Sequence, residues 1–134
     1  MANIKYRVYL SESGWTGWVW DGETAGDLNA TENDFIQKMQ VRLSDAPDKT
    51  NVIYTAYLTG GWGRTGWVSG GQECGNAEED VYIHIVSFQL INNSEELSIL
   101  YRVYINQEGW TGWARDEQYI GHAASLKGIA IKIK

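Results

Sequence analysis

The chain has 134 residues, with seven Trp, eight Tyr and 15 Gly but only two Phe and one Pro, and it carries a formal charge of −6 at pH 7. This acidic balance argues against a nucleic-acid partner, because phosphate binding requires a basic surface. The single cysteine, Cys74, excludes an internal disulfide and a cysteine-based zinc site. No apolar stretch is long enough to cross a membrane, so membrane insertion is not expected.

A short strand pattern near the start of the chain occurs three times. Residues 6–10 read Tyr-Arg-Val-Tyr-Leu, and related pentapeptides stand at 54–58 and 101–105. Alternation of apolar residues with a period of two predicts a strand with one face in the core. The expected inward residues are Tyr6, Val8, Tyr54, Ala56, Tyr101 and Val103, and the expected outward residues are Arg7, Thr55 and Arg102.

Each of these strands is followed by the same series of features. A Gly-Trp…Gly-Trp pair comes first, at 14–18, 61–67 and 109–113, with two extra residues between the tryptophans of the middle pair. A polar turn ending in Gly follows, and an alternating apolar strand closes the unit. We therefore divide the single domain, residues 1–134, into repeat 1 (4–43), repeat 2 (52–90) and repeat 3 (99–133).

This organisation predicts an all-β fold. Each repeat holds only a few short strands and an incomplete core, so the three must close together around a pseudo-threefold axis. We expect a β-prism, because the long first and last strands of each repeat would form a sheet by themselves. A β-trefoil is the alternative, although no Gln-x-Trp signature is present. Residues 30–34 could hold a helical turn, but no helix is required.

The pattern from Tyr6 through Gly14, Trp15 and Trp18 to the strand ending at Leu43 resembles the clostridial hydrophobic tryptophan (ChW) repeat family. The resemblance covers nearly the whole chain in three copies. It implies an accessory module of exported or surface proteins, and hence a secreted or cell-surface location, although no signal peptide precedes the first strand.

The chain departs from the family pattern at three kinds of position, so any family site would differ chemically here and between the repeats. The family usually has His, Thr and an acidic residue at these positions. In this chain they are occupied by Tyr9, Tyr57 and Tyr104; by Asp27, Asn76 and His122; and by Gln37, His84 and Lys127.

The tryptophans allow two interpretations. Those at strand positions (Trp18, Trp67 and Trp113) either pack in the core or bind a ligand, and those in turns either anchor loops or form a ligand platform. So many Trp and Tyr cannot all be buried with their N–H and O–H groups satisfied, so some are expected on the surface. Trp20 has no counterpart in the other repeats and is expected to point outward.

Sugar recognition needs an aromatic face for the apolar side of a pyranose and a few polar groups for its hydroxyls. The chain supplies this mixture three times, which favours a non-catalytic, lectin-like carbohydrate-binding module with up to three sites. Its partner would be a carbohydrate or glycoconjugate; the alternative is a protein-interaction or cell-surface assembly module. The candidate ligand-binding residues are Tyr9, Trp15, Trp18, Asp21 and Asp27; Tyr57, Trp62, Trp67 and Asn76; and Tyr104, Trp110, Trp113, Arg115, Asp116 and His122.

Catalysis is not expected, because the chain has no nucleophile, zinc-protease or phosphate-loop motif and only two His. No cofactor and no metal are predicted; a calcium site formed by Asp21, Glu23 and Asp27 is the alternative. We interpret Cys74 as a buried thiol and His84 as a structural residue. Repeat 2 lacks a counterpart of Asp21, so it is predicted to bind sugar less tightly than repeat 1.

Overall fold

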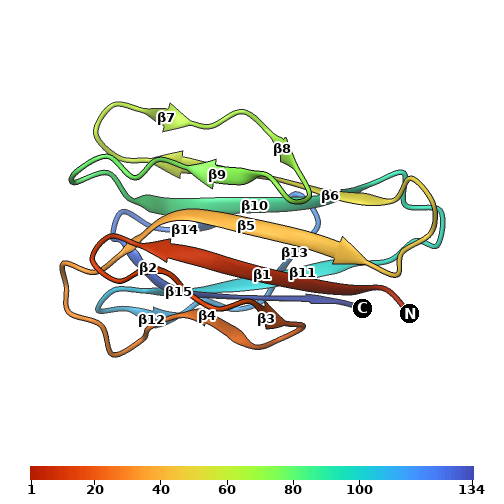
Figure 1. Ribbon diagram of the computed structural model, residues 1–134, viewed down its shortest axis with the longest axis horizontal. Coiled ribbons are helices and arrows are strands. Elements are labelled where there is room, and N and C mark those ends of the chain that lie inside the picture. Colours follow the sequence, from red (N-terminus) through yellow and green to blue (C-terminus); the bar gives the residue numbers. More distant parts are fainter.

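The computed structural model describes residues 1–134, which form strands and turns and no helix (Figure 1). The predicted all-β class is therefore confirmed, and residues 30–34 form turns and bends rather than a helical turn.

The strands form three antiparallel sheets of five strands each, an arrangement compatible with a pseudo-threefold fold. The first sheet contains β1 (Asn3–Leu10), β2 (Gly14–Trp15), β3 (Val19–Trp20), β5 (Ile36–Ser44) and β9 (Glu73–Gly75). The second contains β6 (Asn51–Leu58), β7 (Gly63–Arg64), β8 (Val68–Ser69), β10 (Ile83–Ile91) and β14 (Ile120–Gly121). The third contains β11 (Ile99–Ile105), β12 (Gly109–Trp110), β13 (Ala114–Arg115), β15 (Leu126–Ile133) and β4 (Thr24–Gly26).

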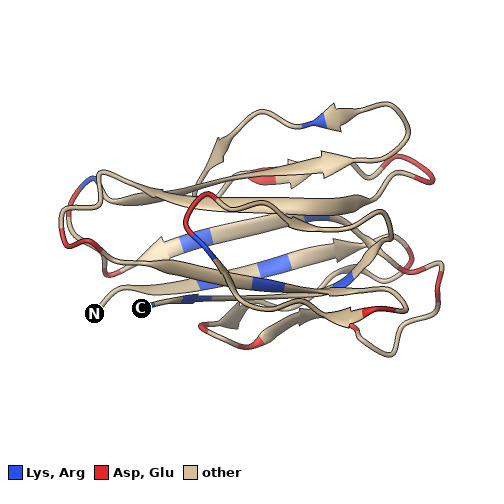
Figure 2. Cartoon of the chain, turned by 180° about the vertical axis from the view of Figure 1, so that it is seen from behind, with Lys and Arg blue, Asp and Glu red and all other residues tan.

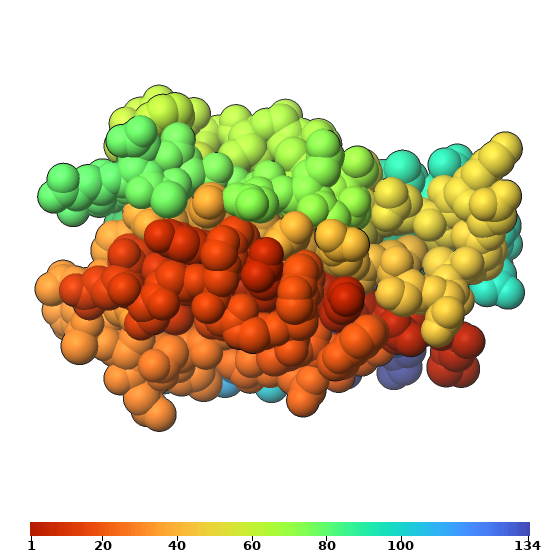
Figure 3. All heavy atoms as spheres, in the orientation of Figure 1, coloured from red at the N-terminus to blue at the C-terminus, as the bar shows by residue number.

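Each sheet takes its fifth strand from a different repeat. Strand β9 of repeat 2 pairs with β5 of repeat 1, β14 of repeat 3 pairs with β10 of repeat 2, and β4 of repeat 1 pairs with β15 of repeat 3. The exchange therefore runs around a closed ring in which every repeat gives one strand and receives one. In the space-filling view, the green residues of repeat 2 lie against the red and orange residues of repeat 1 (Figure 3).

A glycine stands at each crossing in this ring. Gly26, Gly75 and Gly121 have positive φ angles of 126°, 123° and 135°, a region that L side chains rarely adopt. A Cβ at any of the three would also overlap a backbone carbonyl oxygen of the receiving strand. The recurrence of Gly at the end of each polar turn thus has a steric cause.

One apolar cluster of 26 buried residues draws on all three sheets. The predicted inward residues of β1, β6 and β11 all lie in it at 1% exposure or less, so the strand parity is confirmed. One part of the prediction is wrong: Thr55 points to the outer face but is fully buried. Its hydroxyl donates to the carbonyl oxygen of Thr65 at 2.8 Å, so Thr65 lies against this side chain and shields it from solvent.

Three buried tyrosine hydroxyls join neighbouring repeats. The Tyr6 hydroxyl donates to the Glu23 carbonyl in its own repeat and accepts the Ile131 N–H of repeat 3 at 3.0 Å. Tyr54 makes the equivalent bonds within repeat 2 and to Val41 of repeat 1. A Phe at these positions would leave buried backbone groups without a partner, which explains why the inward aromatic is Tyr.

Charge is separated between strands and loops. Of the 17 acidic residues only Glu73 lies in a strand, whereas most Lys and Arg side chains belong to strands (Figure 2). The strands are therefore locally basic in a protein that is acidic as a whole.

Candidate functional site

The tryptophans lie on the outer faces of the sheets, and none of the seven is buried. Trp62 is 53% exposed, Trp20 45%, and Trp67 and Trp113 38% each. The core interpretation of the strand tryptophans is therefore wrong, because the short strands beside them pair at the edge of each sheet and leave the indoles in contact with solvent. The outward position expected for Trp20 is confirmed.

On the first sheet, the tryptophans alternate with cations. The Arg7 guanidinium lies 4.3 Å from the ring centre of Trp15 and 4.7 Å from that of Trp18. Lys38 lies over Tyr9 at 4.9 Å, and the Tyr9 ring meets the edge of Trp15 at 5.5 Å. Cations over indole faces are attracted by the ring quadrupole, so these contacts hold the side chains in place without a bound ligand.

The third sheet repeats the arrangement. Arg102 lies 4.4 Å from Trp110 and 4.8 Å from Trp113, and Lys132 lies 4.2 Å from Trp113. Tyr104 meets Trp110 at 5.5 Å. Arg7 and Arg102 thus hold equivalent Trp pairs in place, which is a structural task that the sequence pattern did not indicate.

On the second sheet, the Trp and Arg positions are rearranged. Tyr57 pairs with Arg64 in the register in which Tyr9 pairs with Trp15. Arg64 therefore occupies the Trp place, and Trp62 lies in the preceding turn. The alignment of Trp62 with Trp15 and Trp110 is wrong, because the added length lies in the hairpin turn and not between equivalent tryptophans.

Two of the predicted acidic ligands hold strand ends. Asp21 accepts the backbone N–H of Ile4 at 3.1 Å, and Asp116 accepts that of Ile99 at 3.0 Å. In repeat 2 the side-chain oxygen of Asn51 takes the equivalent N–H of Val52 at 2.8 Å.

The strand exchange regroups the residues predicted to share a site. Asp27 follows β4 and its backbone N–H bonds to Lys127, so it lies on the third sheet and not beside Tyr9. Asn76 lies likewise on the first sheet and His122 on the second. The side chains of Asp27 and Asn76 each accept a backbone N–H two residues ahead, while His122 contacts Glu108 at 3.0 Å. Arg115 donates to Ser98 at 2.7 Å.

Gln37, His84 and Lys127 anchor loops at equivalent positions. Gln37 donates to the carbonyls of Glu78 and Val81, both at 2.8 Å, and Lys127 donates to that of Asp34 at 2.9 Å. His84 contacts the His122 carbonyl at 2.9 Å, in agreement with its predicted structural role. Burial lowers the pKa of Lys127 below its usual range, with nearby carboxylates opposing the shift. Three different residue types thus perform one task.

The calcium alternative and the single thiol have clear structural outcomes. Glu23, one of the three residues of the calcium alternative, accepts the N–H of Trp20 at 2.7 Å. No group of three or more His, Cys, Asp or Glu side chains is placed to hold a metal ion. Cys74 is buried as predicted, and burial raises the pKa of its thiol to about 11.

A hollow of about 420 Å³ lies on repeat 3 between residues 111–114 and 118–121. Trp113 lines it together with Tyr119, which is 47% exposed. The ring of Tyr57, which does not line the hollow itself, meets Tyr119 at 5.8 Å. Thr111 and Gln118 supply polar groups to the same lining. The equivalent loops of repeats 1 and 2 line no such hollow.

Tyr119 was missed by the sequence reasoning. In strand register it corresponds to Thr24 and Glu73 in the other repeats, neither of which is aromatic. A search for repeated residues therefore could not single it out.

No family model, curated protein or solved structure matches this chain. No helix that could cross a membrane is present.

Proposed function

We propose that the protein is a non-catalytic carbohydrate-binding module and that its main sugar site is the hollow on repeat 3. The observation that carries this proposal is the hollow of about 420 Å³ lined by Trp113 and Tyr119, with the ring of Tyr57 packed against that of Tyr119 at 5.8 Å. A pyranose has an apolar C–H side that packs on an aromatic ring and hydroxyls that bind polar groups at the rim. Here the Thr111 hydroxyl and the Gln118 amide nitrogen can donate to such hydroxyls, while the oxygens of the two side chains accept the backbone N–H groups of Val103 and Arg115.

The packing of Trp113 supports a ready-made platform. Arg102 and Lys132 lie 4.8 Å and 4.2 Å from its ring centre, so the indole is held before any ligand arrives. A ring that is already ordered loses little conformational entropy on binding. Trp15 is less suited, because its side chain is half-buried whereas Trp113 is 38% exposed and lines the hollow.

We propose a β-prism as the architecture. Three separate antiparallel sheets, each with its own outer face, surround one core, which is the expected form of a prism. Membership in the ChW repeat family, with a secreted or cell-surface location, is proposed on the three Gly-Trp pairs. Several weak sites on one module would add avidity toward a repetitive glycan surface.

A protein-interaction module is the second candidate, and one observation favours it. Trp62 and Trp67 are exposed on repeat 2 without a hollow beside them. Exposed aromatic residues without a concave site suit a protein partner better than a single sugar.

A glycan array followed by calorimetry tests the proposal. We expect Trp113→Ala and Tyr119→Ala each to weaken the best glycan at least tenfold, which corresponds to about 1.4 kcal/mol. Trp62→Ala, which removes an exposed Trp far from the hollow in the sequence, serves as the control and is expected to bind normally. Binding that survives both variants, or an array with no bound glycan, would refute the proposal.

A further inference from the structure

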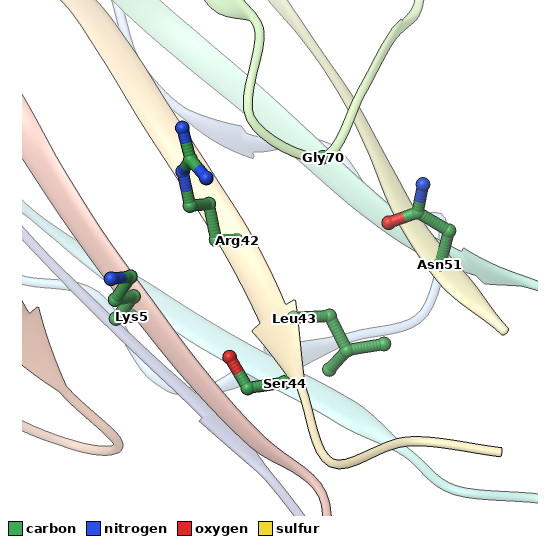
Figure 4. A pocket seen from close by; sticks show the side chains of 6 residues that line it. All are labelled: Lys5, Arg42, Leu43, Ser44, Asn51 and Gly70. Carbon is green, nitrogen blue, oxygen red and sulfur yellow. The ribbon is translucent and has the colours of Figure 1, made fainter. Parts of the chain in front are cut away.

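A second hollow, of about 240 Å³, lies where the β8–β9 turn of repeat 2 covers the first sheet (Figure 4). Its lining comes from three strands and a turn: Lys5 of β1, Arg42 of β5, Asn51 of β6 and Gly70 of the turn. Leu43 and Ser44 complete it, so only one lining residue is apolar.

Two cations face each other across this part of the sheet. Lys5 and Arg42 are directly paired in the β1–β5 register, and no carboxylate lies within ion-pair distance of either. Like charges directly opposite each other destabilise a sheet. Their side chains do reach the Trp18 ring, at 5.1 Å and 5.8 Å, but an indole does not neutralise two positive charges.

The equivalent junctions of the other sheets do not have this charge excess. On the second sheet the residues in the places of Lys5 and Arg42 are Ile53 and Gln89, and Gln89 donates to Glu117 of the covering turn at 2.6 Å. On the third sheet Leu100 stands opposite Lys132, and the covering turn carries Asp21.

The β8–β9 turn, which covers the first sheet, has no acidic residue at the position that Asp21 and Asp116 occupy in the other two turns. Gly70 holds the place of Asp21 and Asp116, since all three donate a backbone N–H to the first strand of their own repeat. A Cβ at Gly70 would stand 2.5 Å from the side-chain oxygen of Asn51, which performs the carboxylate's capping task. The cap is therefore neutral here, and the amide nitrogen of Asn51 is an additional donor at the hollow.

Trp20 adds an aromatic ring beside Lys5 and Arg42 on the outer face. Trp20 of β3 pairs with Lys5 of β1, so Trp20, Lys5 and Arg42 lie side by side across three strands on the outer face. The Lys5 ammonium lies 5.6 Å from the Trp20 ring centre, and Trp20 is 45% exposed. The places of Trp20 on the other two sheets hold Ser69 and Arg115.

We propose that this hollow binds the carboxylate or sulfate group of an acidic sugar, with the sugar ring against Trp20. The inference rests on the proposed carbohydrate function but uses a different site. Arg42 can hold a carboxylate or sulfate through two parallel N–H bonds, while Lys5 and Asn51 add further donors. The anion also removes the repulsion between Lys5 and Arg42, which gives the charged ligand an advantage over its neutral analogue.

Calorimetry with methyl glucuronide, glucose 6-sulfate and neutral methyl glucoside tests the inference. We expect at least one of the two charged sugars to bind about tenfold or more tightly than the neutral one. Arg42→Gln should remove this preference, since it installs the residue found at the equivalent place on the second sheet. Lys134→Gln, which removes the same charge from the exposed C-terminal residue, should leave the preference intact.

A double variant gives the β8–β9 turn and the strand that it caps the residues found at the equivalent positions of repeat 3. Gly70→Asp with Asn51→Ser reproduces the pair of Asp116 and Ser98, an arrangement that this chain already accommodates. The new carboxylate should neutralise Lys5 and Arg42 and abolish the preference for charged sugars. Thermal unfolding monitors the fold of each variant.

The outcomes separate this inference from the proposed function. Neutral sugar binding that depends on Trp113, with no gain from a carboxylate or sulfate, overturns the inference and leaves the proposed function standing. A charged-sugar preference that depends on Arg42, without neutral sugar binding, supports the inference and overturns the repeat 3 site. Inorganic sulfate or acetate binding as tightly as the charged sugars, unaffected by Trp20→Ala, overturns the sugar assignment.

Discussion

The first and second sheets present different outer faces on the same backbone. On the first sheet Arg7 of β1 lies between Trp15 and Trp18. On the second sheet the guanidinium comes from Arg64 of β7, which lies 5.9 Å from Trp67 and donates to Thr55 at 3.3 Å. The basic residue has thus moved from the first strand to the hairpin strand, at the place of the Trp, while the pairing pattern of the strands is retained.

The groups beneath the two faces are the same. Thr16 and Thr65 each accept a backbone N–H of the first strand at 3.2 Å, and so does Thr111 on the third sheet. The buried tyrosine and the crossing glycine recur as well. Residues that satisfy buried backbone groups are therefore common to the repeats, whereas residues that face solvent vary and can give each face a different ligand.

The largest loss of stability is expected on substitution of a glycine at the strand crossings that the three repeats share. Gly75→Ala places a Cβ against the Gln37 carbonyl at a φ of 123°, and strain of this kind costs about 1–3 kcal/mol before the overlap is counted. We expect a loss of about 3 kcal/mol or more in the free energy of unfolding, measured with urea. Gly66→Ala is the matched control, because a Cβ there meets nothing within 4 Å. Equal losses in both variants would contradict the role assigned to the crossing.

The second largest loss of stability is expected for a buried tyrosine whose hydroxyl accepts a backbone N–H. Tyr54→Phe leaves the Val41 N–H without the hydroxyl that accepts it at 3.2 Å, and an unsatisfied buried donor costs about 1–3 kcal/mol. The Tyr101 hydroxyl meets only carbonyl oxygens, that of Gln118 at 2.6 Å and that of Phe88 at 3.4 Å, and accepts no backbone N–H. Urea unfolding should show a greater loss for Tyr54→Phe than for Tyr101→Phe. The reverse order would mean that the accepted bond has little weight.

The buried tyrosines Tyr6 and Tyr54 lead us to expect a loss of stability at alkaline pH. Burial raises the pKa of both Tyr6 and Tyr54 from 10.0 to about 12. A folded-state pKa above the unfolded value stabilises the protein below pH 10 and loses that stabilisation as the pH rises toward 12. Tyr54→Phe should therefore show a smaller loss of stability over this interval. Unfolding is measured in a Cys74→Ala background, because the thiol, with a pKa of about 11, acts in the same direction.

A smaller effect tests the difference between the faces directly. Arg7→Gln removes a cation held between two tryptophans, whereas Arg64→Gln removes one that reaches a single Trp. Cation–π contacts contribute about 0.5–1 kcal/mol each at exposed sites, so Arg7→Gln should cost about 1 kcal/mol or more and Arg64→Gln about half as much. Tryptophan fluorescence should also shift more in the first variant. Equal effects would show that the two faces are energetically alike.

The smallest effect is expected at Trp62. Its side chain is 53% exposed in a turn, and substitutions at such positions usually change stability by less than about 0.5 kcal/mol. Trp110→Ala, by contrast, removes a ring in contact with Arg102 and Tyr104. Thermal unfolding should separate the two variants. A large loss for Trp62→Ala would restore its equivalence to the other turn tryptophans.

The sequence predicted the all-β class and the parity of β1, β6 and β11, because alternation along a strand is a local property. It did not predict the partners of Asp27, Asn76 and His122, since the strands before them pair with the sheet of another repeat. It also placed Trp62 in the wrong register, because only backbone pairing shows that Arg64 lies opposite Tyr57.

The sequence by itself determined the inward faces of β1, β6 and β11, because alternation depends only on residue order and a period of two. Only the tertiary structure decided which side chains share a surface. Lys5, Arg42 and Gly70 are far apart in the chain, and they lie around one hollow because the β8–β9 turn of repeat 2 crosses onto the sheet of repeat 1. Tyr119 likewise joins Tyr57 through the pairing of β14 with β10. Strand exchange brings residues of different repeats together, and no local pattern records which repeat supplies the neighbour.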